Sequence, residues 1–228
     1  MSKFIEVIAI VEGRTEQIFI EDILAPYLAT KKIYIRATQV SKPGQKGGDV
    51  RFERVQKDIG LHLKQRSDTY ITTLVDYYGI KSWPGLETVP SRATPGAIST
   101  ILHKATIDAV QAVYAQQRAD VRFVPYMAIH EFEALLFSDT TVLASALGVS
   151  EHKVISILQE CGEPEAINNS PVTAPSKRLG TLSANGAFPK TTKGIAIAKE
   201  IGVDRMREKC PLFNSWLQKL ESLVGEQV

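Results

Sequence analysis

The chain has 228 residues and a formal net charge of +2, with 44% hydrophobic and 23% charged residues. This is the composition of an ordinary globular protein with enough chain to bury one sizeable core. The small net charge neither requires nor excludes a nucleic-acid partner, and it means that any basic site has to be local.

Two cysteines, Cys161 and Cys210, are too few for a disulfide framework or a cysteine-rich zinc site, and they favour a reducing cytoplasm. The first residues lack the features of a signal peptide, since their apolar run is short and ends at Glu12. No apolar run approaches the ~18 residues of a membrane span. We therefore expect a cytoplasmic protein with no membrane partner.

Strand and helix patterns alternate through the first 138 residues. Buried or half-buried strands are expected at 4–11, 32–40, 69–76 and 121–129. Helical patterns follow them, beginning at Thr15 as a cap, at 50–65, at 98–117 and at Glu131. The loop 41–49 is rich in glycine and has no Walker A order. The alternation predicts an α/β fold with a mostly parallel four-stranded sheet.

Strand patterns stop after Ser138. Helices are expected at 140–147, 151–160, 192–201 and 212–224. The stretch 163–189 is rich in Pro, Ser and Gly and carries no predicted element. The chain is thus divided into an α/β core, residues 1–138, and a helical extension packed on it, residues 139–228.

Acidic residues follow three of the four predicted strands, at the edge where open parallel sheets bind ligands. They are Glu12 and Glu16, Asp76, and Glu131 and Glu133. Gathered carboxylates repel one another and raise each other's pKa. A bound Mg²⁺ or Mn²⁺ relieves that repulsion, because hard cations prefer oxygen ligands. A divalent-metal site is expected here, and the alternative is a set of solvated acids at helix starts and loops.

Glu131 and Glu133 raise a geometric question within this set. Each helical residue turns ~100°, so two acids flanking Phe132 on a regular helix cannot both face one ion. His130, just before them, is either a general base with a pKa near neutrality or a residue that caps the helix.

Five motifs, in this order, resemble a known family: "VEGRTE", "LVDYYG", "HEFEALLF", "APSKRL" and "CPLFNSWLQKL". The first two resemble the Toprim fold of topoisomerases, bacterial primases and related nucleases. Together the five are similar to an uncharacterised Toprim-like family of prokaryotic proteins, the domain of unknown function DUF4276, over nearly the whole chain. The resemblance implies a Toprim-like fold and phosphodiester chemistry with Mg²⁺ or Mn²⁺. It also implies a place in anti-phage defence beside an ABC/SMC-type ATPase.

The same resemblance implies roles for individual residues. Glu12 would be a metal ligand or general acid/base, and Asp76 would hold Mg²⁺. The sequence departs from the usual D-x-D of Toprim proteins, because Tyr78 stands at the second position of "DYY". Glu133 or Glu131 is the natural substitute for the missing ligand. This departure leaves open a degenerate site without catalysis.

Basic residues in the extension complement the acids. Residues 171–209 contain eight Lys or Arg against three acids. Lys and Arg neutralise phosphate, and Arg can do so bidentately. Together with the family resemblance, this predicts that Lys177, Arg178 and Lys193 hold the phosphate, and the alternative is a solvated charged surface.

The sequence thus favours a metal-dependent nuclease with a nucleic-acid substrate, DNA or RNA. The alternative is a catalytically degenerate module that senses nucleic acid or docks on an ATPase. A homo-oligomer is left open by the sequence.

Overall fold

The computed structural model describes residues 4–41, 50–168, 170–184 and 186–225. Its centre is a parallel sheet of five strands, which corrects the predicted four: β1 (Ile5–Val11), β2 (Ile33–Gln39), β3 (Thr69–Asp76), β4 (Phe123–Val124) and β5 (Met127–Ala128). The strand order is β2-β1-β3-β4, and β5 pairs with the end of β3. Apart from Ser41, the predicted loop 41–49 lies outside the described residues.

The fifth strand arises because Pro125 interrupts the predicted strand 121–129. Proline has no N–H to donate to a ladder, so the segment divides into β4 and β5 on either side of it. Two threonines of β3 supply the missing bonds. Thr72 Oγ1 donates to the Val124 carbonyl at 2.6 Å, and Thr73 Oγ1 both donates to the Tyr126 carbonyl and accepts from its N–H.

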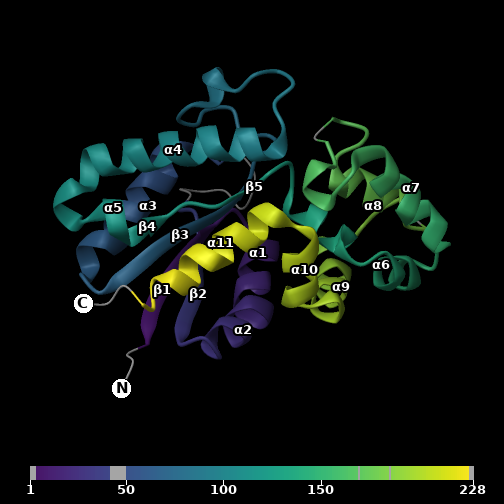
Figure 1. Ribbon diagram of the computed structural model, residues 1–228, viewed down its shortest axis with the longest axis horizontal. Coiled ribbons are helices and arrows are strands. Elements are labelled where there is room, and N and C mark those ends of the chain that lie inside the picture. The colour runs from purple at the N-terminus through teal and green to yellow at the C-terminus, as the bar shows by residue number, and fades with distance from the viewer. Residues whose placement is uncertain (1–3, 42–49, 169, 185, 226–228) are drawn as a thin grey trace.

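Helices cover both faces of the sheet, as Figure 1 shows. Alternate residues of β1 belong to two separate cores, which is why its sequence is apolar at nearly every position. Two helices pack against one face, α3 (Phe52–Gln65) and α4 (Pro95–Tyr114). The other face is covered by α1 (Arg14–Ile18), α2 (Ala25–Ala29) and helices from the C-terminal part of the chain. The short α5 (Ala119–Arg122) leads into β4.

The C-terminal part of the chain is helical, as predicted. Its helices are α6 (Thr140–Leu147), α7 (Glu151–Cys161), α8 (Pro175–Leu182), α9 (Ile195–Ile201), α10 (Val203–Lys209) and α11 (Pro211–Ser222). The helix α8 was not predicted, because Pro, Ser and Gly surround it. Figure 1 shows α11 lying across the sheet. Its Trp216 stacks on Tyr126 with 4.4 Å between ring centroids and donates to Thr72 Oγ1 at 2.8 Å.

A buried carboxylate anchors the start of α11. Both oxygens of Glu165 accept backbone N–H groups, from Leu212 at 2.7 Å and Phe213 at 2.9 Å. Burial raises the pKa of Glu165 to about 7, and the nearby Glu163 contributes to the rise. The ionised side chain therefore costs the folded state more than the unfolded one.

We expect the stability of the protein to fall by about 1 kcal/mol between pH 6 and pH 8 on account of Glu165. The sign follows from a folded-state pKa above the unfolded one, so that stability is lost as the pH rises through the folded-state value. Glu165→Gln should remove this part of the slope in urea unfolding measured across that range. A slope identical in both proteins would contradict the expectation.

Among the described residues, no helix is both long enough and apolar enough to cross a membrane.

Candidate functional site

Glu12 and Asp76 lie at the ends of neighbouring strands. Glu12 follows β1 directly, and its N–H donates to the carbonyl of Leu74 on β3 at 3.3 Å. The backbone N–H of Asp76 in turn lies 3.4 Å from Glu12 Oε2. The parallel pairing of β1 with β3 thus sets the two acids side by side at the carboxyl edge of the sheet.

Glu16 joins them from the first turn of α1. The N-cap of this helix is Gly13, not Thr15 as the sequence suggested, and Glu16 Oε2 accepts the Gly13 N–H at 3.0 Å. Thr15 is instead a buried residue inside that turn. Burial raises the pKa of Glu16, and the charge of Glu12 adds to the rise.

Glu131 and Glu133 have different partners. Glu131 is in an extended conformation just before a 3₁₀ helix, Phe132–Ser138, and accepts from Ser176 N at 2.7 Å and Ser176 Oγ at 2.8 Å. It therefore ties the core to the start of α8. The Glu133 side chain is 1% exposed, and its Oε1 lies 2.8 Å from Lys190 Nζ. Its Oε2 has no hydrogen-bond partner among the described residues.

Asp76 connects these acids. Its Oδ1 accepts the Phe132 N–H at 2.8 Å and so holds the 3₁₀ helix against the strand end. Burial, followed by the charges of Glu133, Glu16 and Glu12, raises the pKa of Asp76 well above its usual range. Such mutual perturbation means that the four carboxyl groups share one electrostatic environment. We call Glu12, Glu16, Asp76 and Glu133 the acidic cluster.

Lys190 is a cation in direct contact with this cluster, and the sequence did not single it out over Lys193. It begins a π-helical turn, Lys190–Gly194, that leads into α9. Burial works to lower the pKa of Lys190, but the charges of Glu133, Glu131 and Asp76 outweigh it and the pKa is raised. One ammonium group thus offsets part of the negative charge at the sheet edge.

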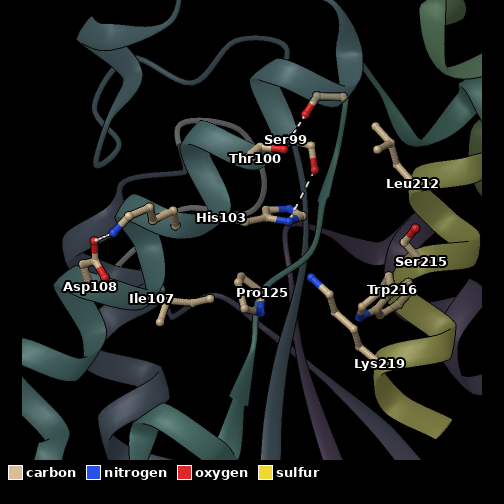
Figure 2. A pocket seen from close by; sticks show the side chains of 12 residues that line it. Ser99, Thr100, His103, Ile107, Asp108, Pro125, Leu212, Ser215, Trp216 and Lys219 are labelled. Carbon is tan, nitrogen blue, oxygen red and sulfur yellow. Dashed lines mark hydrogen bonds and ion pairs between the residues drawn. The ribbon is translucent and has the colours of Figure 1, made fainter. Parts of the chain in front are cut away.

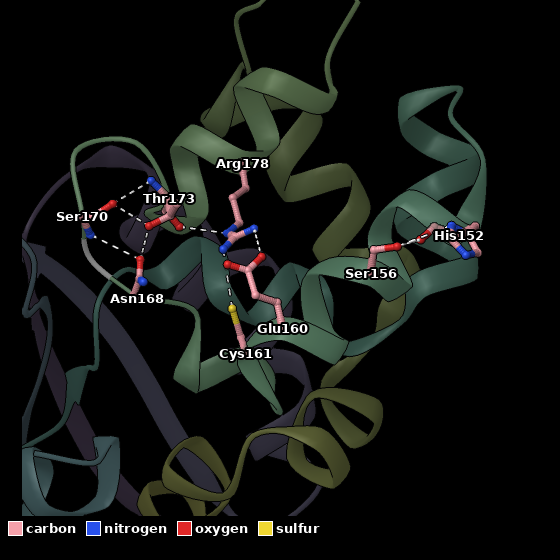
Figure 3. Close-up of polar contacts among 8 residues, drawn as sticks. All are labelled: His152, Ser156, Glu160, Cys161, Asn168, Ser170, Thr173 and Arg178. Carbon is pink, nitrogen blue, oxygen red and sulfur yellow. Dashed lines mark hydrogen bonds and ion pairs between the residues drawn. The ribbon is translucent and has the colours of Figure 1, made fainter. Parts of the chain in front are cut away.

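The predicted phosphate-binding residues lie elsewhere. Figure 3 shows Arg178 turned into the helical extension, where it pairs with Glu160 at 3.1 Å and donates to the carbonyl of Thr173 at 3.0 Å. Lys177 is exposed on α8, and Lys193 is half-buried on the same turn as Lys190. Among the described residues, no hydrogen bond or ion pair joins any of the three to the acidic cluster, and Arg178 serves the packing of α7 on α8.

The cluster suits a hard divalent cation in its chemistry but is not assembled as a metal centre. Carboxylate oxygens are the ligands that Mg²⁺ and Mn²⁺ prefer, and the repulsion that raises the pKa of Asp76 is what a cation would relieve. Within the part of the chain that the structure describes, however, no three His, Cys, Asp or Glu side chains are arranged to hold a metal ion.

His130 has an unusual backbone at this edge. Its φ of 73° is in the left-handed region, and its carbonyl accepts the N–H of Tyr78 at 2.8 Å. Burial lowers the pKa of His130 to about 4, so the ring is neutral at neutral pH. The left-handed residue turns the chain from β5 toward Glu131, which places the two acids after it.

Comparison with known proteins gives a family. No curated protein and no solved structure matches the chain. The model of the DUF4276 family, described as a domain of unknown function, matches residues 11–221. This range includes the whole acidic cluster, Lys190 and all but the last residue of α11, so the chain belongs to the DUF4276 family.

Proposed function

We propose that the protein is a divalent-metal-dependent nuclease that hydrolyses phosphodiester bonds. The observation that carries the proposal is the meeting of Glu12, Glu16, Asp76 and Glu133 with Lys190 at the carboxyl edge of a parallel sheet. Several carboxylates of raised pKa beside one lysine form an environment suited to a metal and a phosphate.

Each residue of the cluster has a role in this proposal. Asp76 and Glu133 would hold Mg²⁺ or Mn²⁺. When bound, such a cation stabilises the negative charge on a phosphoryl oxygen and lowers the pKa of a bound water. Glu12 orients or deprotonates the attacking water, or serves as a further ligand. Glu16 holds the Gly13 turn that aims Glu12.

In this proposal, Lys190 takes the phosphate-binding role that was predicted for Lys177, Arg178 and Lys193. Its ammonium group is 2.8 Å from Glu133 Oε1, and its side chain is 42% exposed. If Glu133 held the cation, the Lys190 ammonium would be available to neutralise a phosphate oxygen of the substrate. Lys177, exposed beside the Ser176 that binds Glu131, can contact the nucleic-acid backbone.

The wider setting in this proposal comes from the motif resemblance. The order of the "VEGRTE" and "LVDYYG" motifs supports a Toprim-like fold. With that fold we propose a role in anti-phage defence, together with an ABC/SMC-type ATPase.

A second candidate is a degenerate module that docks on such an ATPase or senses nucleic acid without cleaving it. Two observations favour it. Tyr78 replaces the second acid of the D-x-D pattern, and its backbone N–H donates to the His130 carbonyl. In addition, the described carboxylates do not form a ready metal centre.

Cleavage assays separate contamination from activity. Single- and double-stranded DNA and RNA are incubated with wild-type protein and Mg²⁺ or Mn²⁺, beside Glu12→Gln. We expect Glu12→Gln to lower cleavage by about 100-fold or more. Glu200→Gln, an exposed glutamate on α9, is the matched control and should cleave as wild type. Equal cleavage by Glu12→Gln would refute the assignment, and Mn²⁺ binding without cleavage would favour the second candidate.

A further inference from the structure

A cavity of about 490 Å³ lies between α4 and α11, and none of its lining residues belongs to the acidic cluster. Figure 2 shows it, with Pro125 of the β4–β5 connection on one side. Ile107, Leu212 and Trp216 supply apolar walls. The volume is within the ~300–1,000 Å³ typical of small-molecule sites.

His103 defines the proton arrangement on the α4 side. Its Nε2 accepts the N–H of Met127 at 3.2 Å, because a backbone amide can only donate. The ring proton is therefore on Nδ1, which donates to Ser99 Oγ at 3.3 Å. Burial, with a smaller contribution from the charge of Lys219, lowers the pKa of His103 to about 4, so the ring stays neutral.

This arrangement makes Ser99 a donor toward the cavity. Its oxygen already accepts from His103, which leaves the hydroxyl proton for another partner. Thr100, the next residue, differs because its hydroxyl donates to the Gly96 carbonyl at 2.8 Å within the helix. Ser99 and Thr100 therefore form a natural pair of test and control positions.

The charges of the lining are not balanced. Asp108 is paired with Lys104 at 2.7 Å. Lys219, whose amine points into the cavity in Figure 2, has no ion pair among the described residues. Ser215, one turn before Lys219 on α11, adds a second hydroxyl. Within the described part of the chain, the lining groups that remain free to bind a ligand are the Lys219 ammonium and the hydroxyl groups of Ser99 and Ser215.

We propose that this cavity binds a small anionic molecule, whose carboxylate or phosphate pairs with Lys219 and accepts from Ser99, and whose apolar body lies against Ile107 and Trp216. This site is independent of the proposed nuclease chemistry, because it shares no residue with the acidic cluster.

Calorimetry with three probes tests the site. Benzoate and phenyl phosphate present a carboxylate and a phosphate on the same ring, and benzyl alcohol is the neutral analogue. At least one anion is expected to bind with a dissociation constant of about 1 mM or below. The stronger of the two identifies the anion class, and benzyl alcohol should bind at least about tenfold more weakly.

Variants locate the binding. Lys219→Met and Ser99→Ala should each weaken the better anion, the first by about tenfold. Thr100→Val and Lys199→Met, the latter at an exposed lysine on α9 outside the cavity, are controls that should bind as wild type. The proposal is overturned if neither anion binds, if benzyl alcohol binds equally well, or if Lys219→Met retains wild-type affinity.

Discussion

Asp76→Asn is expected to unfold at a higher urea concentration than the wild type at pH 8, while losing Mn²⁺ binding and at least about 1,000-fold of any cleavage. Asparagine keeps an oxygen that can accept the Phe132 N–H, now 2.8 Å from Oδ1. It removes the charge that Glu133, Glu16 and Glu12 oppose. The gain in the free energy of unfolding should be about 1–2 kcal/mol.

The pH dependence of this gain has a definite sign. The pKa of Asp76 is raised in the folded state from an ordinary value of 3.8. The contribution of Asp76 to stability is therefore largest at low pH and is lost as the pH rises through the folded-state value, so the advantage of asparagine should grow from pH 5 to pH 8. Asp108→Asn, at an exposed ion pair, is the control. A destabilised Asp76→Asn protein at pH 8 would show that the carboxylates do not repel one another.

Lys190→Met is expected to act in the opposite direction and to destabilise the protein by about 2 kcal/mol at pH 8. It leaves Glu133, only 1% exposed, without its cation. The estimate is below the usual cost of breaking a buried pair, because Lys190 itself is partly exposed. The loss should shrink at pH 5.5, since burial raises the pKa of Glu133 and lets it take up a proton.

Two further variants test whether this loss comes from the ion pair between Lys190 and Glu133. Lys193→Met, on the same π-helical turn, should unfold close to wild type. Adding Glu133→Gln to Lys190→Met should restore most of the lost stability, because the unpaired charge is gone. Mn²⁺ affinity should rise in Lys190→Met, since the ion no longer competes with the ammonium. If Lys190→Met and Lys193→Met lost the same free energy of unfolding, Lys190 would have no particular role in the acidic cluster.

The strand ends could be predicted from the sequence because they follow from topology. The alternation of strands and helices predicts a parallel sheet, and parallel pairing brings the strand ends at Glu12 and Asp76 together. The split at Pro125 was not predicted, although a proline cannot continue an internal ladder and Pro125 was the signal for it. The hydrogen bonds that Thr72 and Thr73 of β3 make to this segment depend on the pairing of two strands, so they could not be predicted from the sequence.

The choice between lysines could not be made from local composition. Lys190 and Lys193 share the segment "FPKTTKG", and only the π-helical turn decides which one reaches Glu133. The contact between Glu131 and Ser176 could not be predicted either, because Ser176 lies on α8, a helix that the sequence did not indicate. Both contacts are long-range, so neither leaves a periodic signal in the sequence.

The position of α11 also bears on how the polypeptide matures on the ribosome. Trp216 bonds to Thr72 on β3 and stacks on Tyr126, so residues near the end of the described chain close a face begun by the first strands. A nascent chain of which only the first 138 residues have emerged would expose that apolar face, and it would lack Lys190 as well. Chaperone binding during synthesis, and its release once α11 docks, is the consequence to look for.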